Sequence, residues 1–567
     1  MNFDWEYYIN KYEDLIPAGF NNEQRALDHW NQWGQHEGRR YVRDNEILFI
    51  IITTECIKSI AINLQHILSK MNIKSIIKYI LSDYDINNTN ENDKYIILYN
   101  SRGDLKLPNV YIWYQVEQTK SMNFNIHALQ NSRIIWDFSI KNYNNYKQLP
   151  LHNIYYMPLP FYYNISTEAI DNDSYQYDIF FYGAPNYRRS NILNLLKTKY
   201  NIKIGFCVFG DERDNYIKSS KIIINLHYYD EAVVETARFN EVLKFNKLII
   251  SETSSSLKYD YYNVNLYKDL VVFIDNINDD LSNIDQLYAT LDNYLNNQDI
   301  YDNKIEFIKK NKYKLMDQSE YFIKRNLLSA LELTNVKIDY ELKPDIIYCL
   351  HLPETPVRYN LFMNQPNYNN ILNKIEFYPA IKYQPGWKGC AFSYVNLIYN
   401  AQRCNLKQIT VCEDDCCFNE DFDIKYNIIS EFLKKINVWD LFVGVIADLP
   451  HDTTVSNVYY YKNMTFIEIN KMTSTVFNIY NNTCFDKILK YNIHSNTTRD
   501  TIDEHIKRCN FKIIVPVPFE FSCLNTESTL WGSNCFDYYN SMFNKSSALI
   551  NRLIKNFLVS NIPTIIY

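Results

Sequence analysis

Short runs of consecutive apolar residues alternate with amphipathic segments of helical spacing along most of this chain. The runs EILFIIIT (46–53), DIFFYG (178–183) and DIIYCLHL (345–352) open three such successions. Continuous apolar runs of strand length are typical of parallel strands buried on both faces, which need helical crossovers between them. The alternation therefore predicts an α/β fold built from Rossmann-like units.

The length and the positions of these runs predict the domain organisation. A chain of 567 residues corresponds to three or four domains of average size. The pattern divides it into a helical module (1–44), two Rossmann-like lobes (45–170 and 171–335) and a further α/β unit (343–567). Two Rossmann-like lobes in tandem imply a cleft at the carboxyl ends of their strands, where ligands bind.

Charge and glycine content exclude several classes of function. Lys and Arg number 58 against 65 Asp and Glu, a net charge of −7, which argues against a nucleic-acid-binding protein. With only 11 glycines, a Gly-rich phosphate loop is disfavoured, and a nucleotide site must use Arg side chains, helix ends or a metal. No apolar run reaches the roughly 18 residues of a membrane span, and no secretion signal opens the sequence. We therefore expect a cytoplasmic protein.

The 12 cysteines are scattered, and in a large chain without a secretion signal we expect them to be reduced. Cys412, Cys416 and Cys417 lack a second CxxC pair or a histidine at zinc spacing, so the pattern does not predict a zinc site.

Aromatic residues are concentrated in the first 44 positions. Ala26, Trp30 and Trp33 are spaced to share one helix face, and Pro17 and Gly19 separate this helix from an earlier one. The block predicts a helical hairpin whose aromatic residues form either a small core or a carbohydrate-stacking surface. It also resembles a short module at the front of glycosyltransferases of large DNA viruses.

Three carboxylates follow the apolar strand QITVC in the last unit, at Glu413, Asp414 and Asp415. Side chains alternate along a strand, so Glu413 and Asp415 are expected to point the same way and Asp414 the other way. Oxygen ligands of this kind suit Mg²⁺ or Mn²⁺, which can bridge a substrate diphosphate. The alternative is a turn with solvated charges.

Upstream of this triplet stands a GxxGCxxS pattern formed by Gly386, Gly389, Cys390 and Ser393. Together with the EDD triplet it resembles glycosyltransferase family 25, which has a nucleotide-diphospho-sugar fold of the GT-A kind. That family usually has His after the Ser, where this chain has Tyr394. The resemblance implies that Glu413 and Asp415 hold Mn²⁺ or Mg²⁺, and that Asp414 and Arg358 bind the nucleotide sugar.

A second acidic segment, TIDEH (501–505), opens a predicted helix late in the same unit. It resembles an acidic segment of the same family, which makes Asp503 a candidate catalytic carboxylate. The alternative is that Asp503 only stabilises the positive end of the helix dipole.

The second lobe carries cations beside its predicted helix starts. Arg188 and Arg189 follow the strand DIFFYG, where a helix N-terminus and guanidinium groups suit a diphosphate. A strand (221–229), a helix (231–245) and a strand (247–252) come next. Their ETxRxxE string resembles the donor-binding half of GT-B glycosyltransferases related to bacterial capsular polysaccharide enzymes. The resemblance implies that Arg238 contacts the diphosphate and Glu241 the ribose; the alternative is an exposed i, i+3 ion pair between them.

In the first lobe, Glu117 follows the strand VYIWYQ and is expected to face the cleft. Glycosyl transfer requires an acceptor hydroxyl to lose its proton, so Glu117 is a candidate base. The alternative is an exposed carboxylate at a strand end.

These patterns favour a bifunctional glycosyltransferase, with a GT-B module followed by a metal-dependent GT-A module. Its donors would be nucleotide sugars, expected to be UDP-linked, and its acceptor a glycan or glycoprotein. The alternatives are a glycan-binding or scaffold protein with one inactive module, and a metal-dependent phosphodiesterase. The latter needs a second carboxylate cluster, for which only Asp503 and Glu504 are available.

Overall fold

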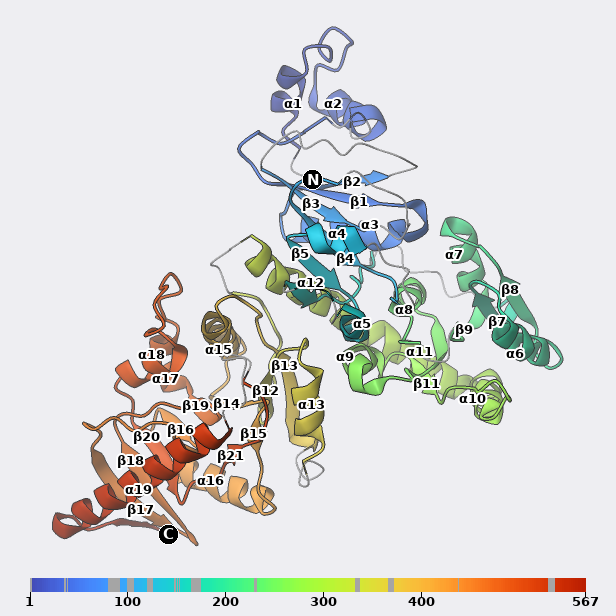
Figure 1. Ribbon diagram of the computed structural model, residues 1–567. Coiled ribbons are helices and arrows are strands. Elements are labelled where there is room, and N and C mark those ends of the chain that lie inside the picture. Colours follow the sequence, from blue (N-terminus) through green and yellow to red (C-terminus); the bar gives the residue numbers. More distant parts are fainter. Residues whose placement is uncertain are drawn as a thin grey trace. The chain divides into compact units, whose positions relative to one another are not determined.

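The computed structural model describes residues 3–34, 37, 39–79, 92–98, 107–119, 126–146, 149, 151, 153–164, 175–228, 232–331, 337–365, 372–436, 438–528 and 536–567 (Figure 1). The chain forms two compact units, residues 1–323 and 324–567.

Two short helices open the first unit, α1 (Trp5–Lys11) and α2 (Glu23–His29), and a π-helical turn follows over Trp30–Gly34. Each helix begins at a polar cap. The side chains of Asp4 and Asn22 accept hydrogen bonds from backbone N–H groups three residues further on, which satisfies donors that the helix itself leaves open.

The aromatic residues of this hairpin form a core. Tyr8 and Trp30 are fully buried and belong to the same hydrophobic cluster as Leu48 and Ile50 of the first strand. The core of the helical module therefore continues into the adjoining sheet. Trp33, which the helical spacing placed on the same face as Trp30, is 48 % exposed, because the chain there follows a π-helical turn.

The first sheet is fully parallel, with the strand order β2-β1-β3-β4-β5-β6. Burial on both faces explains its continuous apolar strands. Its elements are β1 (Leu48–Thr53), a 3₁₀ turn (Glu55–Ile57), α3 (Lys58–Lys70), β2 (Ser75–Tyr79), β3 (Asp93–Ile97), β4 (Tyr111–Gln115), α4 (Ile126–Asn131), β5 (Ile134–Asp137), α5 (Ile140–Tyr146) and β6 (Ile154–Tyr156).

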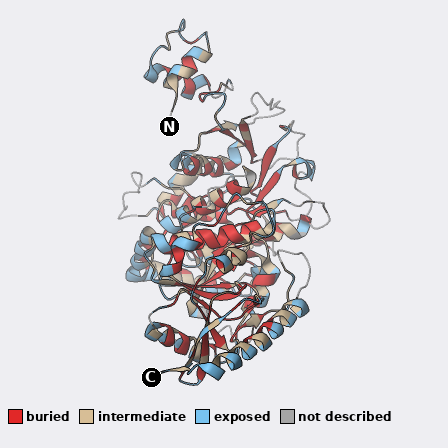
Figure 2. Ribbon diagram, turned by 90° about the vertical axis from the view of Figure 1, so that its left-hand side faces the viewer, coloured by how far each residue is buried: buried red, intermediate tan, exposed pale blue. Residues whose placement is uncertain are grey.

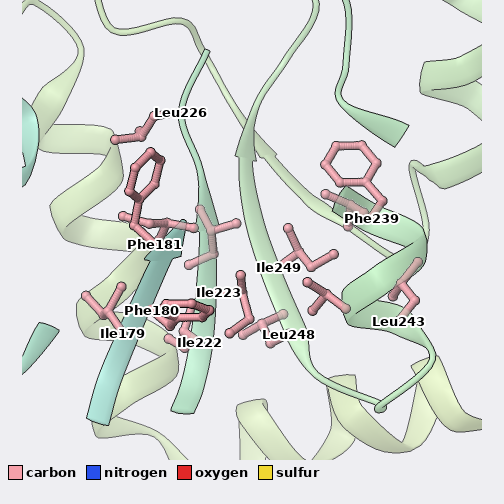
Figure 3. Packing of buried hydrophobic residues seen from close by; sticks show 14 of the residues in the cluster. Ile179, Phe180, Phe181, Ile222, Ile223, Leu226, Phe239, Leu243, Leu248 and Ile249 are labelled. Atoms are coloured by element: carbon pink, nitrogen blue, oxygen red, sulfur yellow. The ribbon is translucent and has the colours of Figure 1, made fainter. Parts of the chain in front are cut away.

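The second sheet of this unit is also parallel, in the order β8-β7-β9-β10-β11. Its elements are β7 (Tyr177–Tyr182), α6 (Tyr187–Lys197), β8 (Ile202–Gly205), α7 (Gly210–Lys218), β9 (Ser220–Asn225), α8 (Thr236–Leu243), β10 (Leu248–Glu252), α9 (Leu257–Tyr267), β11 (Val272–Ile274), α10 (Ile284–Asn296), α11 (Gln298–Asn311) and α12 (Tyr313–Ala330). Figure 3 shows Leu248 and Ile249 of β10 beside Leu243 of α8 in its core. The first five strands of each sheet, numbered along the chain, therefore stand in the same spatial order, 2-1-3-4-5.

Two boundaries of the second sheet differ from the sequence prediction. The apolar run IGFCVFG (204–210) predicts a strand over its whole length, but the observed strand ends at Gly205, because Cys207 has a φ of 57° and turns the chain out of the strand. The expected helix over 231–245 begins only at Thr236, since residues 232–235 are non-helical. This later start brings Glu235 and Arg238 to the first turn of α8.

The second unit contains a mixed sheet in the order β13-β12-β14-β19-β16-β20-β18-β17-β22 and a separate ribbon, β15-β21. Its elements are β12 (Ile347–His351), α13 (Pro356–Met363), a 3₁₀ turn (Leu372–Lys374), β13 (Ile375–Pro379), α15 (Gly386–Arg403), β14 (Gln408–Glu413), β15 (Cys416–Cys417), α16 (Phe422–Ile436), β16 (Leu441–Val443), β17 (Val455–Tyr461), β18 (Met464–Ile469), β19 (Phe477–Asn481), α17 (Asn482–Ile488), α18 (Ile502–Arg508), β20 (Ile513–Val517), β21 (Ser522–Cys523), α19 (Phe536–Ser560) and β22 (Thr564–Ile566). Figure 2 shows that buried residues gather in the strands, with exposed residues on outer helix faces.

In each of the three large sheets, the second strand along the chain pairs with one side of the first strand, and the third strand pairs with its other side. The reversal falls between β1 and β3, between β7 and β9, and between β12 and β14. The two strands that flank each reversal pair directly and run parallel, so their carboxyl ends lie at the same edge of the sheet. Ligands of α/β proteins bind outside that edge, at the reversal itself. The α/β class predicted from the sequence, with parallel Rossmann-like sheets, is confirmed.

In the described part of the chain, no helix is both long and apolar enough to cross a membrane.

Candidate functional site

Two guanidinium groups meet at the β7/β9 reversal, beside Gly183. This glycine directly follows β7 and has a φ of 144°, which side-chain-bearing residues rarely adopt. A Cβ atom placed on it would lie 3.0 Å from Nη2 of Arg238 and 3.2 Å from Nη1 of Arg189. The absence of a side chain therefore lets both cations approach the backbone at the strand end.

Arg189 stands in the first turn of α6 and is held by backbone carbonyls. Its Nε and Nη2 donate to the carbonyl oxygen of Leu226 at 3.0 and 2.6 Å, and its Nη1 donates to that of Ala184 at 2.9 Å. Burial and the neighbouring charge of Arg238 lower the pKa of Arg189 to about 10. A cation in such a position would be stabilised by an anionic ligand.

Arg238 lies one turn into α8, where its guanidinium packs over the ring of Tyr182 at 4.9 Å. Its Nη1 donates to Oδ1 of Asn225, at the end of β9. Its Nε is buried and has no hydrogen-bond partner among the residues that the structure describes. Buried donors without a partner are costly, so this atom marks a place where a ligand oxygen would be favourable.

Behind these arginines lies a buried pair, His227 and Glu235. Nδ1 of His227 is 2.9 Å from Oε2 of Glu235, and its Nε2 is 2.8 Å from the carbonyl oxygen of Thr253. Burial alone would raise the pKa of Glu235, but His227 and Arg238 hold it at about 2. Burial would lower the pKa of His227, yet Glu235 raises it. Nη2 of Arg189 lies 3.8 Å from Oε1 of the same Glu235, so this carboxylate stands between His227 and the two arginines.

Two other predicted donor residues are occupied by intramolecular ion pairs. Arg188 is buried and forms a two-pronged pair with Glu252 of β10, with its Nη1 3.0 Å from Oε2. Glu241 pairs with Arg213 at 2.5 Å and with Lys244 at 2.6 Å, and not with Arg238 as an i, i+3 pair would require. In this conformation both side chains stabilise the lobe, and a role in nucleotide binding remains a prediction.

Arg188 also lines a cavity of about 350 Å³ at the same sheet edge, together with His227, Ser255 and Asn276. Oδ1 of Asn276 is buried without a hydrogen-bond partner. His227 lines this cavity and also pairs with Glu235 behind Arg189 and Arg238. The cavity therefore lies next to the two arginines. It offers room beside this strand end for a further part of a ligand.

Glu117 is exposed just beyond β4 of the first sheet. The neighbouring Gln118 contacts the segment that leads into α8: its Nε2 donates to the carbonyl oxygen of Val233 at 3.2 Å, and its Oε1 accepts from the Val233 N–H at 3.3 Å. Glu117 is therefore anchored next to the chain that carries Glu235 and Arg238. The structure brings these predicted residues to one region of the first unit.

The second charged cluster stands at the β12/β14 reversal. His351 ends β12, and its Nδ1 lies 2.6 Å from Oδ2 of Asp414, which directly follows β14. Oδ1 of Asp414 accepts from Nε of Arg358 on α13 at 2.8 Å. Burial would raise the pKa of Asp414, but Arg358 and His351 hold it at about 2. Asp414 and Arg358, both predicted to bind a nucleotide sugar, are thus paired with each other.

Glu413 and Asp415 have few compensating partners. Burial and the charge of Asp415 raise the pKa of Glu413 to about 7, and burial also raises the pKa of Asp415. Oδ2 of Asp415 lies 3.0 Å from Nη2 of Arg358, whereas its Oδ1 is buried and has no hydrogen-bond partner in the described part of the chain. Two half-buried carboxyl groups that repel each other, one with an unpaired oxygen, fit a divalent cation.

The coordination that the protein itself can provide is limited. Among the described residues, no group of three or more His, Cys, Asp or Glu side chains is arranged to hold a metal ion. A cation bound by Glu413 and Asp415 would therefore take its other ligands from substrate and water, which is usual for Mg²⁺. The predicted Mn²⁺ or Mg²⁺ site remains a prediction that these two side chains fit.

Asp503 lies in the first turn of α18 and accepts a hydrogen bond from the N–H of Glu504 at 3.1 Å. Together with Glu413 and Asp415, its charge adds to burial in raising the pKa of the Cys390 thiol. Asp503, Glu413 and Asp415 therefore all lie near Cys390 of α15. Its bond to the helix N-terminus also agrees with the dipole-stabilising alternative.

The GxxGCxxS pattern has a packing role in the structure. A Cβ on Gly389 would lie only 2.7 Å from the carbonyl oxygen of Ile381. The Oγ of Ser393 donates to the Gly389 carbonyl at 2.7 Å and accepts from the Ile381 N–H at 2.8 Å. These contacts hold α15 against the preceding segment and so fix the helix beside β14.

We expect Gly389→Ala to destabilise the second unit by about 1–3 kcal/mol, because the new methyl group would force backbone atoms apart. Chemical denaturation followed by fluorescence would measure this, with Gly386→Ala at the first position of the same helix as a comparison. An unchanged midpoint for Gly389→Ala would contradict the packing role.

The raised pKa of Glu413 predicts a pH dependence for the metal-free protein. Between pH 4.5 and 7 the folded state keeps this proton while the unfolded state loses it, so stability falls as pH rises. We expect Glu413→Gln to remove about 1–2 kcal/mol of this decline. Thermal unfolding in a chelator across this pH range would test it; identical slopes for both proteins would contradict the prediction.

Sequence reasoning assigned no role to three residues that touch the predicted ones: His227, His351 and Tyr394. The hydroxyl of Tyr394 donates to the Thr475 carbonyl oxygen at 2.9 Å and lies 3.3 Å from Oε1 of Glu413. The two histidines stand at or just after strand ends, and that position is the signal that could have identified them.

No protein-family model matches the chain. Over 203 residues it is 29 % identical to an uncharacterized protein of Acanthamoeba polyphaga mimivirus, a stretch that covers 35 % of this chain and 70 % of that protein. This relative comes from a giant virus, which agrees with the expected likeness to proteins of large DNA viruses.

Solved structures with partial similarity include an α1,3-fucosyltransferase, which is 12 % identical. The match covers 47 % of this chain and 83 % of that chain, with a TM-score of 0.29. The glycosyltransferase of kitacinnamycin follows at 6 % identity, 50 % of this chain, 99 % of that chain and a TM-score of 0.27. A protein described as a UDP-N-acetylglucosamine 2-epimerase from Listeria monocytogenes has 8 % identity, 50 % and 96 % coverage and a TM-score of 0.27. Scores this low do not establish a shared fold.

Proposed function

We propose that the protein is a glycosyltransferase that uses nucleotide sugars, with one donor site in each unit. The observation that carries this proposal is the pair Arg189 and Arg238 around Gly183, at the reversal point of a parallel sheet. A diphosphate would meet two guanidinium groups, the start of α8 and a buried Nε donor that has no other partner. This combination supports an anionic nucleotide ligand without a Gly-rich loop.

In the first unit the reaction would proceed without a metal. As the bond between the sugar and the diphosphate breaks, negative charge develops on the leaving oxygen, and Arg189 and Arg238 would stabilise it. His227 and Glu235 would act behind them by holding Asn225 and the start of α8 in place. Glu117 is the proposed base for the acceptor hydroxyl, because it is anchored beside the same segment.

In the second unit Glu413 and Asp415 would hold Mn²⁺ or Mg²⁺. When bound, such an ion supplies positive charge that stabilises the leaving diphosphate. Arg358 and Asp414 would position Asp415 through their buried pair, and Asp503 is the proposed catalytic carboxylate on the acceptor side. This half corresponds to the proposed GT-A module, and the first unit to the proposed GT-B module.

The two sites together make a bifunctional enzyme that would act on a glycan or glycoprotein, with UDP-sugars as the first donors to test. The competing proposal is a glycan-binding or scaffold protein in which one unit is inactive. The Asp415 oxygen without a partner and the Arg238 nitrogen without a partner favour two binding sites, since neither atom contributes to stability as it stands.

Hydrolysis of a panel of nucleotide sugars, measured with Mn²⁺ and with a chelator, would test the proposal. We expect one activity that survives the chelator and one that requires Mn²⁺, because the two sites stabilise the leaving group differently. Saturable binding of a nucleotide sugar without turnover at one site would favour the scaffold alternative. No binding of any nucleotide sugar to either site would overturn the proposed function.

A further inference from the structure

Two cysteines face each other across the ribbon β15-β21, directly beside the candidate cation site. Cys416 is paired with Cys523, and Cys417 with Ser522, in antiparallel register. The N–H of Leu524 donates to the carbonyl oxygen of Asp415 at 2.6 Å, which makes residues 415 and 524 a hydrogen-bonded pair. Because the two kinds of pair alternate along an antiparallel ladder, Cys416 and Cys523 form a non-hydrogen-bonded pair.

This position brings the two sulfur atoms within reach of each other. Opposed residues of a non-hydrogen-bonded pair have Cα atoms about 4.5 Å apart and side chains on the same face. Disulfides require Cα atoms roughly 4.4–6.8 Å apart, so no strand would have to move far. Both thiols are free and both belong to the same hydrophobic cluster, which agrees with side chains that point to one side.

We propose that Cys416 and Cys523 are an oxidisable pair that closes to a disulfide and thereby fixes Asp415. The ribbon holds the backbone of Asp415 through Leu524, and the next residues reach Arg358, whose Nη1 donates to the carbonyl oxygen of Glu527 at 2.9 Å. A covalent link at Cys416, one residue after Asp415, would restrain the site that contains Asp415 and Arg358. The effect on the cation site rests on the proposed function, whereas the link itself does not.

Glutathione disulfide can serve as the oxidant. Cys523 is 9 % exposed and Cys416 is fully buried, so the Cys523 sulfur attacks first and displaces one glutathione thiol. Cys416 then attacks the Cys523 sulfur of this mixed disulfide and displaces the second glutathione. The two cysteines lose two electrons and two protons, and the oxidant is reduced to two molecules of glutathione.

Peptide mapping of the full chain after treatment with glutathione disulfide tests the link. Trypsin would leave Cys416 on a peptide of residues 408–425 and Cys523 on one of residues 513–545, and we expect these two joined. The second peptide also contains Cys535, which lies outside the described residues, so matched variants decide the partner. The linked species should disappear in Cys523→Ser and in Cys416→Ser, and persist in Cys535→Ser and in Cys417→Ser. Persistence in Cys523→Ser, or no linked species in the wild type, would overturn the proposal.

Thermal unfolding and Mn²⁺ titration of the oxidised and reduced proteins test the consequence. The link closes a long loop, so we expect Tm to rise by about 5–15 °C on oxidation in the wild type and not in Cys523→Ser. Because the link restrains Asp415, we expect oxidised protein to bind Mn²⁺ at least about threefold more tightly. Equal or weaker affinity would overturn the effect on the site. If neither form binds Mn²⁺, the proposed cation site fails, while the peptide map still decides the link.

Discussion

Arg238→Ala is expected to reduce metal-independent turnover of the nucleotide sugar by at least about 100-fold, which corresponds to about 2.7 kcal/mol of transition-state stabilisation. The physical reason is that the guanidinium lies at the strand end beside Gly183, with a buried Nε donor that no described residue accepts from. Removing it leaves the departing diphosphate with Arg189 alone. The measurement is kcat/KM for donor hydrolysis in the presence of a chelator.

Two comparisons separate this loss from a general effect of removing an arginine. Arg238→Lys keeps the positive charge but loses the forked set of guanidinium donors. We expect it to retain part of the activity that Arg238→Ala loses. Arg133→Gln changes an exposed arginine that directly precedes β5, at the amino-terminal edge of the first sheet. This variant should leave turnover unchanged. If Arg238→Ala retains full chelator-resistant activity with an unchanged Tm, the donor site of the first unit has been assigned wrongly.

Asp415→Asn is expected to abolish the Mn²⁺-dependent activity, with a loss of about 100- to 1,000-fold, while the chelator-resistant activity persists. The substitution keeps the size of the side chain but removes one of the two carboxylates that fit the cation. It also relieves the repulsion that raises the pKa of Glu413, so the variant should fold. A Mn²⁺ concentration about 100 times Kd should raise the Tm of the wild type by about 5–10 °C and leave that of Asp415→Asn unchanged.

Asp486→Asn is the matched control for this experiment. Asp486 is an exposed aspartate on α17 of the same unit, and its Oδ1 accepts a hydrogen bond from Gln402. We expect this variant to keep both the Mn²⁺-dependent activity and the Mn²⁺-dependent rise in Tm. Mn²⁺-dependent turnover that is intact in Asp415→Asn would refute the assignment of the metal site.

The local pattern was sufficient to predict most of the strands that carry the sites. β1, β7, β12 and β14 are long, continuous apolar runs, and such runs are recognisable because both of their faces are buried. The three-residue strands β6 and β11 and the helix α19 were not predicted. Strands this short carry too few residues for a periodic signal and depend on pairing with neighbours.

The candidate residues differ in how far sequence could define their roles. The alternation rule predicted that Glu413 and Asp415 would point one way and Asp414 the other, yet Arg358 contacts both Asp414 and Asp415. Likewise, a spacing of three residues on a helix suggested an Arg238–Glu241 ion pair. Arg213, from α7, pairs with Glu241 instead, and no local pattern could indicate a partner 28 residues away.

The sequence by itself determined the α/β class, the residue types at the strand ends and the scarcity of glycine, which favours arginine over a Gly-rich loop in the proposed phosphate site. Only the tertiary structure decided which charges are neutralised and which are not. Arg188 and Arg189 are adjacent in the chain, yet Arg188 is paired with Glu252 of a different strand while Arg189 faces Gly183 beside Arg238. The reason is that local sequence fixes backbone conformation and burial, whereas the partner of a buried charge is set by strand order, which joins residues far apart in the chain.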